Sequence, residues 1–280
     1  MKKPPSLKLL VLFLVVLSGA TISLSQKKPI ATKKATAIAS NKAILRRARK
    51  ASYNLRNRGL LEFQATVNPN WRLVLKDQFA SDPTSADAAL KLLNGIHFTV
   101  AMDPAGVVKV THQTDVAAPN PKAEEGFAQI YSGMEQAMTG FFDSWKPFML
   151  TEPFPEVESV YNLQKTPTGY LLTYQESENT DVATTMSKRL VITEMRVTTP
   201  AFKSVLKPQF VRSPQGLLLT RYDAIYDGIT DNSHVVLSVQ IENQETSGQQ
   251  LPHKLSLQGT SEGSPFSMEL ALGNYQVKNR

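Results

Sequence analysis

The sequence predicts an α+β protein that is mainly β: a strongly curved antiparallel sheet, or incomplete β-barrel, of about eleven strands with covering helices. Three observations predict this class. Runs of alternating apolar and polar residues recur along the chain, which is typical of strands with one buried face. Three pairs of these runs are joined by a similar short turn. One long stretch, residues 121–147, instead has its apolar residues at helical spacing.

Residues 1–25 have the layout of a secretory signal peptide. Three lysines come first, an apolar run from Leu9 to Leu17 follows, and small residues come next. The small residues favour cleavage after Ser25, with Ala20 as the second choice. The apolar run is shorter than the roughly 20 residues that a membrane-spanning helix needs. We therefore expect an exported protein, periplasmic or extracellular, and an uncleaved N-terminal anchor is the alternative.

Charge divides the chain into a basic arm and an acidic body. The arm, Lys27–Arg58, holds eleven Lys or Arg and no acidic residue, whereas the chain from Gly59 onward has 17 basic and 24 acidic residues, a net charge of −7. Such an arm can contact an anionic membrane surface, or it can be a solvated leader. It lacks the interleaved aromatic residues of a nucleic-acid site, so no nucleic acid is expected. There is no cysteine, and hence no disulfide.

The elements are expected in the following order. Residues 26–58 form a flexible leader and then a helix, which begins near Ser40 or Asn41 and ends at Arg58-Gly59. Residues 59–280 form a single domain. A short helix, Thr84–Leu93, is capped by Thr84 or Ser85. The expected strands are Leu61–Val67, Trp71–Phe79, Ile96–Met102, Val107–His112, Val157–Lys165, Tyr170–Glu176, Met186–Thr198, Phe202–Arg212, Leu217–Tyr226, Val235–Glu245, Lys254–Thr260 and Phe266–Val277.

Three turns share one pattern, with Asp, Thr or Ser first, proline second and glycine fourth. They are Asp103-Pro104-Ala105-Gly106, Thr166-Pro167-Thr168-Gly169 and Ser213-Pro214-Gln215-Gly216. Proline presets φ for the second position of a type I turn, and glycine suits a left-handed fourth position. Each turn therefore predicts an antiparallel hairpin and a positive φ at its glycine.

The helix from Pro121 to Trp145 is the candidate cover of an apolar cavity, with Pro147 expected to stop it. Gly126, Gly133 and Gly140 are seven residues apart and lower its independent stability. Methionine adapts its shape to irregular apolar partners. The residues expected to line a ligand cavity are Phe127, Ile130, Met134, Met138, Phe141 and Trp145. An ordinary core helix would show a similar pattern.

No catalytic motif stands out, and we expect no enzyme, no metal and no cofactor. The glycine bulge places His112 opposite Phe98, which separates it from His97. Ser204 and Lys207 match a serine-x-x-lysine pattern, but their segment alternates like a strand, whereas that mechanism needs a helix start. The pairs Glu156/Glu158 and Glu176/Glu178 could share a strand face, as glycosidase carboxylates do, although exposed strands carry such residues routinely.

The order of elements resembles the periplasmic lipoprotein-carrier (outer-membrane lipoprotein-sorting) superfamily. The matching features are the signal peptide, a helix Asn41–Asn57 leading into Leu61–Val67, helices inserted among strands, and closing hairpins through Leu255–Leu257 and Phe266–Val277. The resemblance implies a half-open barrel whose helix-covered apolar cavity holds acyl chains. The long basic arm and the acidic body depart from that family, and no binding arginine is carried over.

Together these features predict an exported lipid- or acyl-binding carrier or sensor of the bacterial cell envelope. The ligand would lie in the concave face of the sheet. The alternative is a non-enzymatic structural or scaffold protein whose concave face is filled by its own side chains. A mostly apolar cavity of about 300–1,000 Å³ would distinguish the first from the second.

Overall fold

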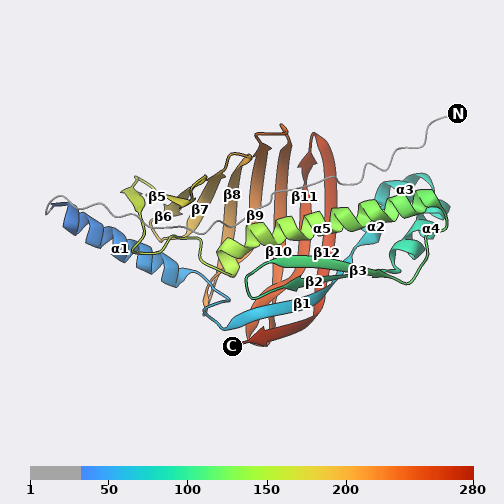
Figure 1. The fold of residues 1–280 in the computed structure, drawn as a ribbon, viewed down its shortest axis with the longest axis horizontal. Helices are drawn as coiled ribbons and strands as arrows, with labels where there is room; N and C mark the ends of the chain where they lie inside the picture. Colours follow the sequence, from blue (N-terminus) through green and yellow to red (C-terminus); the bar gives the residue numbers. More distant parts are fainter. Residues whose placement is uncertain (1–32) are drawn as a thin grey trace.

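The protein is built on one sheet of twelve antiparallel strands, and helices lie against it (Figure 1). A computed structural model describes residues 33–280, so the predicted signal peptide and residues 26–32 lie outside the described residues. The strand order is β3-β2-β1-β12-β11-β10-β9-β8-β7-β6-β5-β4. Within this part of the chain β3 and β4 are the two edges, and no ladder joins them. The sheet is therefore open, mainly β as predicted, with twelve strands in place of about eleven.

The twelve strands are β1 Leu60–Pro69, β2 Ile96–Met102, β3 Val108–Thr114, β4 Tyr161–Lys165, β5 Gly169–Ser177, β6 Thr180–Ser187, β7 Ile192–Thr198, β8 Phe202–Ser213, β9 Gly216–Gly228, β10 His234–Thr246, β11 Gln249–Ser261 and β12 Ser264–Asn279. The helices are α1 Lys33–Ala51, α2 Trp71–Val74, α3 Lys76–Ser81, α4 Pro83–Leu93 and α5 Pro121–Met149. Among the described residues, β1–β12 is the one ladder between strands that are not consecutive in the chain, because every other ladder joins consecutive strands.

Helix α5 lies across one face of the sheet and runs past β9 to β12 (Figure 1). We call this the inner face and the opposite side the outer face. Asn120 caps the helix, because its side-chain oxygen accepts a hydrogen bond of 3.0 Å from the backbone N–H of Ala123. The expected stop at Pro147 is wrong, since the helix continues through it to Met149. Fully buried side chains on both sides of the proline, including Trp145 and Met149, hold this last turn in place.

The N-terminal helix starts earlier and ends earlier than expected. It begins at Lys33, inside the segment predicted to be flexible, and stops at Ala51 rather than at Arg58-Gly59. The chain leaves the helix because the following residues bond to other elements. The backbone N–H of Tyr53 donates to the carbonyl of Leu217, and that of Leu55 donates to the carbonyl of Met149. Leu45, Ala48, Tyr53 and Leu55 are buried in the same core as the sheet.

The predicted strand Trp71–Phe79 is wrong, and the segment forms the short helices α2 and α3. Its apolar residues Trp71, Leu75 and Phe79 are four apart, which is a helical spacing that the polar residues between them obscured. The side chain of Asn70 caps α2 by accepting from the N–H of Leu73 at 3.2 Å. The cap of α4 is Asp82, which accepts from the N–H of Ser85, and not Thr84 or Ser85.

The predicted strand Met186–Thr198 is also wrong, because a turn divides it between β6 and β7. The turn contains neither glycine nor proline, so nothing in the local sequence marks it. Leu190 takes a left-handed conformation, with φ of 63°, and its side chain is 6% exposed. Apolar burial thus holds a backbone conformation that leucine rarely adopts.

Two of the three turn glycines behave as predicted. Gly106 has φ of +82° and Gly216 has φ of +127°, whereas Gly169 is not left-handed. Gly169 instead pairs with Ser187 as the first residue of β5. A Cβ there would lie 1.9 Å from the carbonyl oxygen of Met186, so this position requires glycine for close strand approach. The hairpins themselves are confirmed, and His112 does pair with Phe98.

Candidate functional site

A pocket of about 220 Å³ lies between one side of α5 and the inner face of the sheet. Its wall on the sheet side comes from eight strands, β5 to β12. Six of these strands each contribute one buried nonaromatic apolar side chain, and these are Val182, Met195, Leu206, Leu237, Leu257 and Met268. The alternation of side chains along a strand directs all six to the same face. The site therefore depends on the register of most of the sheet.

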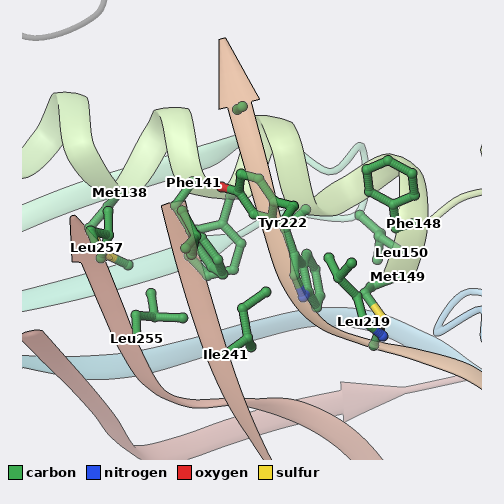
Figure 2. Packing of buried hydrophobic residues seen from close by; sticks show 14 of the residues in the cluster. Met138, Phe141, Phe148, Met149, Leu150, Leu219, Tyr222, Ile241, Leu255 and Leu257 are labelled. Carbon is green, nitrogen blue, oxygen red and sulfur yellow. Dashed lines mark hydrogen bonds between the residues drawn. The ribbon is translucent and has the colours of Figure 1, made fainter. Parts of the chain in front are cut away.

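Aromatic rings complete the apolar lining. Phe141 and Phe148 come from α5, and Tyr174, Phe202, Tyr226 and Phe266 come from β5, β8, β9 and β12. On its other side α5 packs onto the core of the sheet, as Figure 2 shows for Met149 beside Leu219. The helix thus divides the inner face into a filled part and a part that remains hollow.

Small residues on α5 make room for the pocket. The helix contributes Ala137, Gly140 and Ser144 at spacings of three and four, so the three lie on one flank. The hydroxyl of Ser144 is 3.0 Å from the carbonyl oxygen of Gly140 and 2.6 Å from the phenol hydroxyl of Tyr226. A serine hydroxyl has one proton. If it donates to Gly140, the Tyr226 hydroxyl donates to Ser144, and the pair forms a polar spot in an apolar wall.

Three carboxylates belong to the lining, and two of them have a basic partner. Asp143 is 2.6 Å from Lys146, and Glu152 pairs with Arg49. Glu176 has no ion-pair partner among the side chains that the structure describes, those of residues 40–121 and 123–280. Burial by the surrounding protein raises the pKa of the Glu176 carboxyl, although solvent still reaches its side chain. Among the described side chains, those that line the pocket include no Lys, Arg or His.

Of the six residues predicted to line a ligand cavity, the structure brings only Phe141 into the pocket wall. The other five, Phe127, Ile130, Met134, Met138 and Trp145, are between 0 and 8% exposed and belong to the main core. Their helical periodicity identified the buried side of α5 correctly. The pocket lies beside that side, along the small residues. The sequence did contain a signal for the pocket, namely the spacing of the small residues Ala137, Gly140 and Ser144 on one flank of the helix. Of these three, we named only Gly140 from the sequence.

The other candidate residues do not form a reactive group. Ser204 lines the pocket from β8, whereas Lys207 is exposed on the outer face beside Asp223. A separation of three along a strand puts the two on opposite faces. The ring of His112 stacks on Tyr131 with centroids 3.6 Å apart. Within the described residues no three His, Cys, Asp or Glu side chains come together as a metal site would require.

Part of the basic arm pairs with acids of the body. Lys42 and Arg46 contact Glu158, and Arg49 contacts Glu152 and Glu156. The hydrogen bond from Lys42 lowers the pKa of Glu158. Glu156 and Glu158 therefore hold α1 rather than share a strand face, since they precede β4. Arg56 donates to the carbonyls of Leu60, Leu61, Asp103 and Pro104, which ties the arm to the β2–β3 turn.

Comparison with known proteins adds no relative. No family model, no curated protein and no solved structure matches the chain. No helix in residues 33–280 has the length and apolarity required to cross a membrane.

Proposed function

We propose that this chain is an exported, non-enzymatic carrier or sensor of the bacterial cell envelope that binds a lipid or acyl chain in the pocket beside α5. The observation that carries the proposal is the pocket itself, whose lining is mostly apolar and comes from α5 and eight strands. Ligand sites are typically concave and apolar with a few polar groups. The open sheet then serves as an incomplete barrel, with α5 as one wall of its ligand site.

The size of the pocket restricts the ligand. Its volume of about 220 Å³ is below the roughly 300–1,000 Å³ that we expected of a ligand cavity. A single narrow alkyl chain fits this description better than a two-chain lipid. The polar groups that could receive the end of the chain are the Ser144–Tyr226 pair and the Glu176 carboxylate.

The test is a substitution that fills the pocket from a position outside the core. Ala137 is partly exposed and lines the pocket, so Ala137→Phe places a ring where the ligand would lie. We expect at least tenfold weaker binding of a single-chain lipid and an unchanged unfolding midpoint. The matched control is Ala128→Phe, an exposed position of the same helix outside the pocket. Native mass spectrometry of the protein purified from the envelope would identify lipid that co-purifies with the wild type.

A structural or scaffold protein is the second candidate. The observation that favours it is the packing of α5, where five of the six predicted cavity residues are part of a filled core. In that case the wild-type protein would bind no single-chain lipid, and Ala137→Phe would behave like Ala128→Phe.

The basic arm is proposed to contact an anionic membrane surface. Lys42, Arg46 and Arg49 already have acidic partners, so the residues available for such contact include the exposed Arg47 and Lys50. The double substitution Arg47→Glu/Lys50→Glu should weaken binding to anionic vesicles several-fold. Added salt should also weaken binding of the wild type, because the electrostatic screening length falls to about 8 Å at physiological ionic strength. Equal binding to neutral vesicles would contradict this.

A further inference from the structure

We propose that the pocket selects a single-chain amphiphile whose polar end is a cation, an alkylammonium group, and discriminates against the fatty-acid carboxylate. This inference rests on the proposed function and specifies its ligand class. The first evidence is the charge of the pocket wall. Residues from α5, from the segment after it and from eight strands line the pocket, and no described residue of this lining is Lys, Arg or His. A bound carboxylate would therefore find no cation in the wall to offset its lost hydration.

Of the three carboxylates in the pocket wall, Glu176 is the one available to interact with a ligand. Asp143 and Glu152 are held by Lys146 and Arg49. Glu176 has neither an ion-pair partner nor a side-chain hydrogen bond among the residues that the structure describes. Its surroundings raise the pKa of its carboxyl through burial alone. A cationic ligand group would restore to this carboxylate the favourable interaction that burial removes.

The backbone at Glu176 is irregular, which supports a role for this residue in ligand binding. The ladder between β5 and β6 pairs Gln175 with Asp181 and Ser177 with Thr180, so the register shifts at Glu176 and leaves it without a cross-strand partner. Such bulges occur next to functional sites, where they redirect a side chain. The side chain of Glu176 lines the pocket and is accessible to solvent, so a ligand can reach it.

The aromatic lining suits the same ligand. Tyr174 lies two residues before Glu176 on the same strand and also lines the pocket, with Phe202 and Tyr226 from β8 and β9. The faces of aromatic rings attract cations, most strongly where water is excluded. The alkyl chain would then extend along Leu206, Leu237 and Leu257. Carboxylate and rings together define a cation-selective end and an apolar remainder.

The experiment compares ligands that differ only in their polar end. The neutral fluorescent probe N-phenyl-1-naphthylamine is bound to the mature protein and displaced at neutral pH by dodecylamine, dodecanol or dodecanoate, below their micelle concentrations. We expect dodecylamine to displace the probe at a concentration at least tenfold lower than dodecanoate, with dodecanol between them. Glu176→Gln, which keeps the shape and removes the charge, should abolish this order and leave probe binding intact.

Glu178→Gln is the matched control, because Glu178 lies two residues further on, in the turn outside the pocket lining, and it should keep the wild-type order. Equal or better displacement by dodecanoate overturns the charge inference and leaves the lipid pocket standing, and so does an amine preference that survives in Glu176→Gln. Failure of the probe and of all three ligands to bind overturns the proposed function together with this inference.

Discussion

Gly106 and Gly169 come from the same four-residue pattern, yet each is required for a different physical reason. Gly106 has a left-handed backbone, which disfavours any residue with a Cβ. Gly169 has no such conformation and is required by the carbonyl oxygen of Met186, which comes closer than a Cβ permits. The four-residue motif predicts that glycine is required at both positions. The surrounding structure determines whether the reason is backbone conformation or close approach of a neighbouring strand.

Replacing Gly169 tests that distinction. Gly169→Ala should lower the free energy of unfolding by roughly 1–3 kcal/mol, because the new methyl group forces β5 and β6 apart. Gly126→Ala in α5 is the control, since nothing lies within 4 Å of its added Cβ, and it should raise stability by about 0.5–1 kcal/mol. Denaturant unfolding measures both. Equal effects of the two substitutions would contradict the close strand approach.

The raised pKa of Tyr226 predicts that the folded protein loses stability at alkaline pH. Burial raises the pKa of Tyr226 to about 12, an effect that its hydrogen bond with Ser144 partly offsets. The folded protein therefore holds the phenol proton more tightly than the unfolded chain, whose tyrosines titrate near about 10. The stabilisation from this group is complete below pH about 10 and is lost as the pH rises through about 12. Burial also raises the pKa of Tyr222, so both residues contribute to the decline.

The measurement is the free energy of unfolding between neutral pH and pH about 12. Tyr226→Phe should cost about 1 kcal/mol at neutral pH through the lost hydrogen bond, and its alkaline decline should be shallower than that of the wild type. An identical slope in the two proteins would show that Tyr226 does not titrate in this range.

At the scale of elements, α1 and α5 are held by quite different forces. The C-terminal half of α5 is held by apolar packing, with Met138, Phe142 and Trp145 fully buried. Helix α1 buries Leu45 and Ala48 and is also held by charge, because its basic side chains contact the acidic segment after α5. Arg49 is central to this contact, since it also donates to the carbonyl of Pro155 at 2.6 Å.

Removing Arg49 should loosen α1. Its side chain is 19% exposed, and that of Glu152 is 17% exposed, so Arg49→Ala leaves a mostly buried carboxylate without its cation. We expect a loss of about 2 kcal/mol, less than for a fully buried pair, and faster amide hydrogen exchange in α1. Arg47→Ala, at an exposed position of the same helix, should change stability by less than about 0.5 kcal/mol. Glu152→Gln in the Arg49→Ala background should restore part of the loss, and an absence of any recovery would contradict the pairing.

At the scale of the whole molecule, stability comes from a single core without disulfides. This core unites residues 45–55, the sheet and α5. The hollow beside α5 is the part of the inner face that this core leaves unfilled. The body that surrounds it carries net negative charge, which agrees with the charge of the proposed ligand.

Export of this molecule remains a prediction from the sequence. The mature protein should begin after Ala20 or Ser25, because small residues follow the apolar run that a signal peptidase would recognise. Sequencing of the N-terminus, on protein taken from the host envelope, checks this. Retention of Met1 in the membrane fraction would instead establish an uncleaved anchor.

Local patterns determined a large part of the fold. The hairpins, the position of α5 and the pairing of His112 with Phe98 follow from alternation, helical spacing and turn chemistry. These signals depend on neighbours close in sequence, whose geometry the backbone period defines. The same reasoning failed where tertiary burial overrides local preference. Leu190 holds a turn that no turn residue marks. The error at α2 and α3 has another cause, because their helical spacing of four was present in the sequence and was interpreted as a strand.

Only the tertiary structure decided where the pocket lies. Periodicity shows which side of α5 is buried, but it cannot show which buried positions meet close-packed partners and which border a hollow. That difference depends on the summed side-chain volumes of eight strands and one helix brought together from distant parts of the sequence. For the same reason Glu176 was only one of a pair of exposed acids in the sequence. The fold placed Glu176 in the lining of an apolar pocket, without an ion-pair partner among the described side chains.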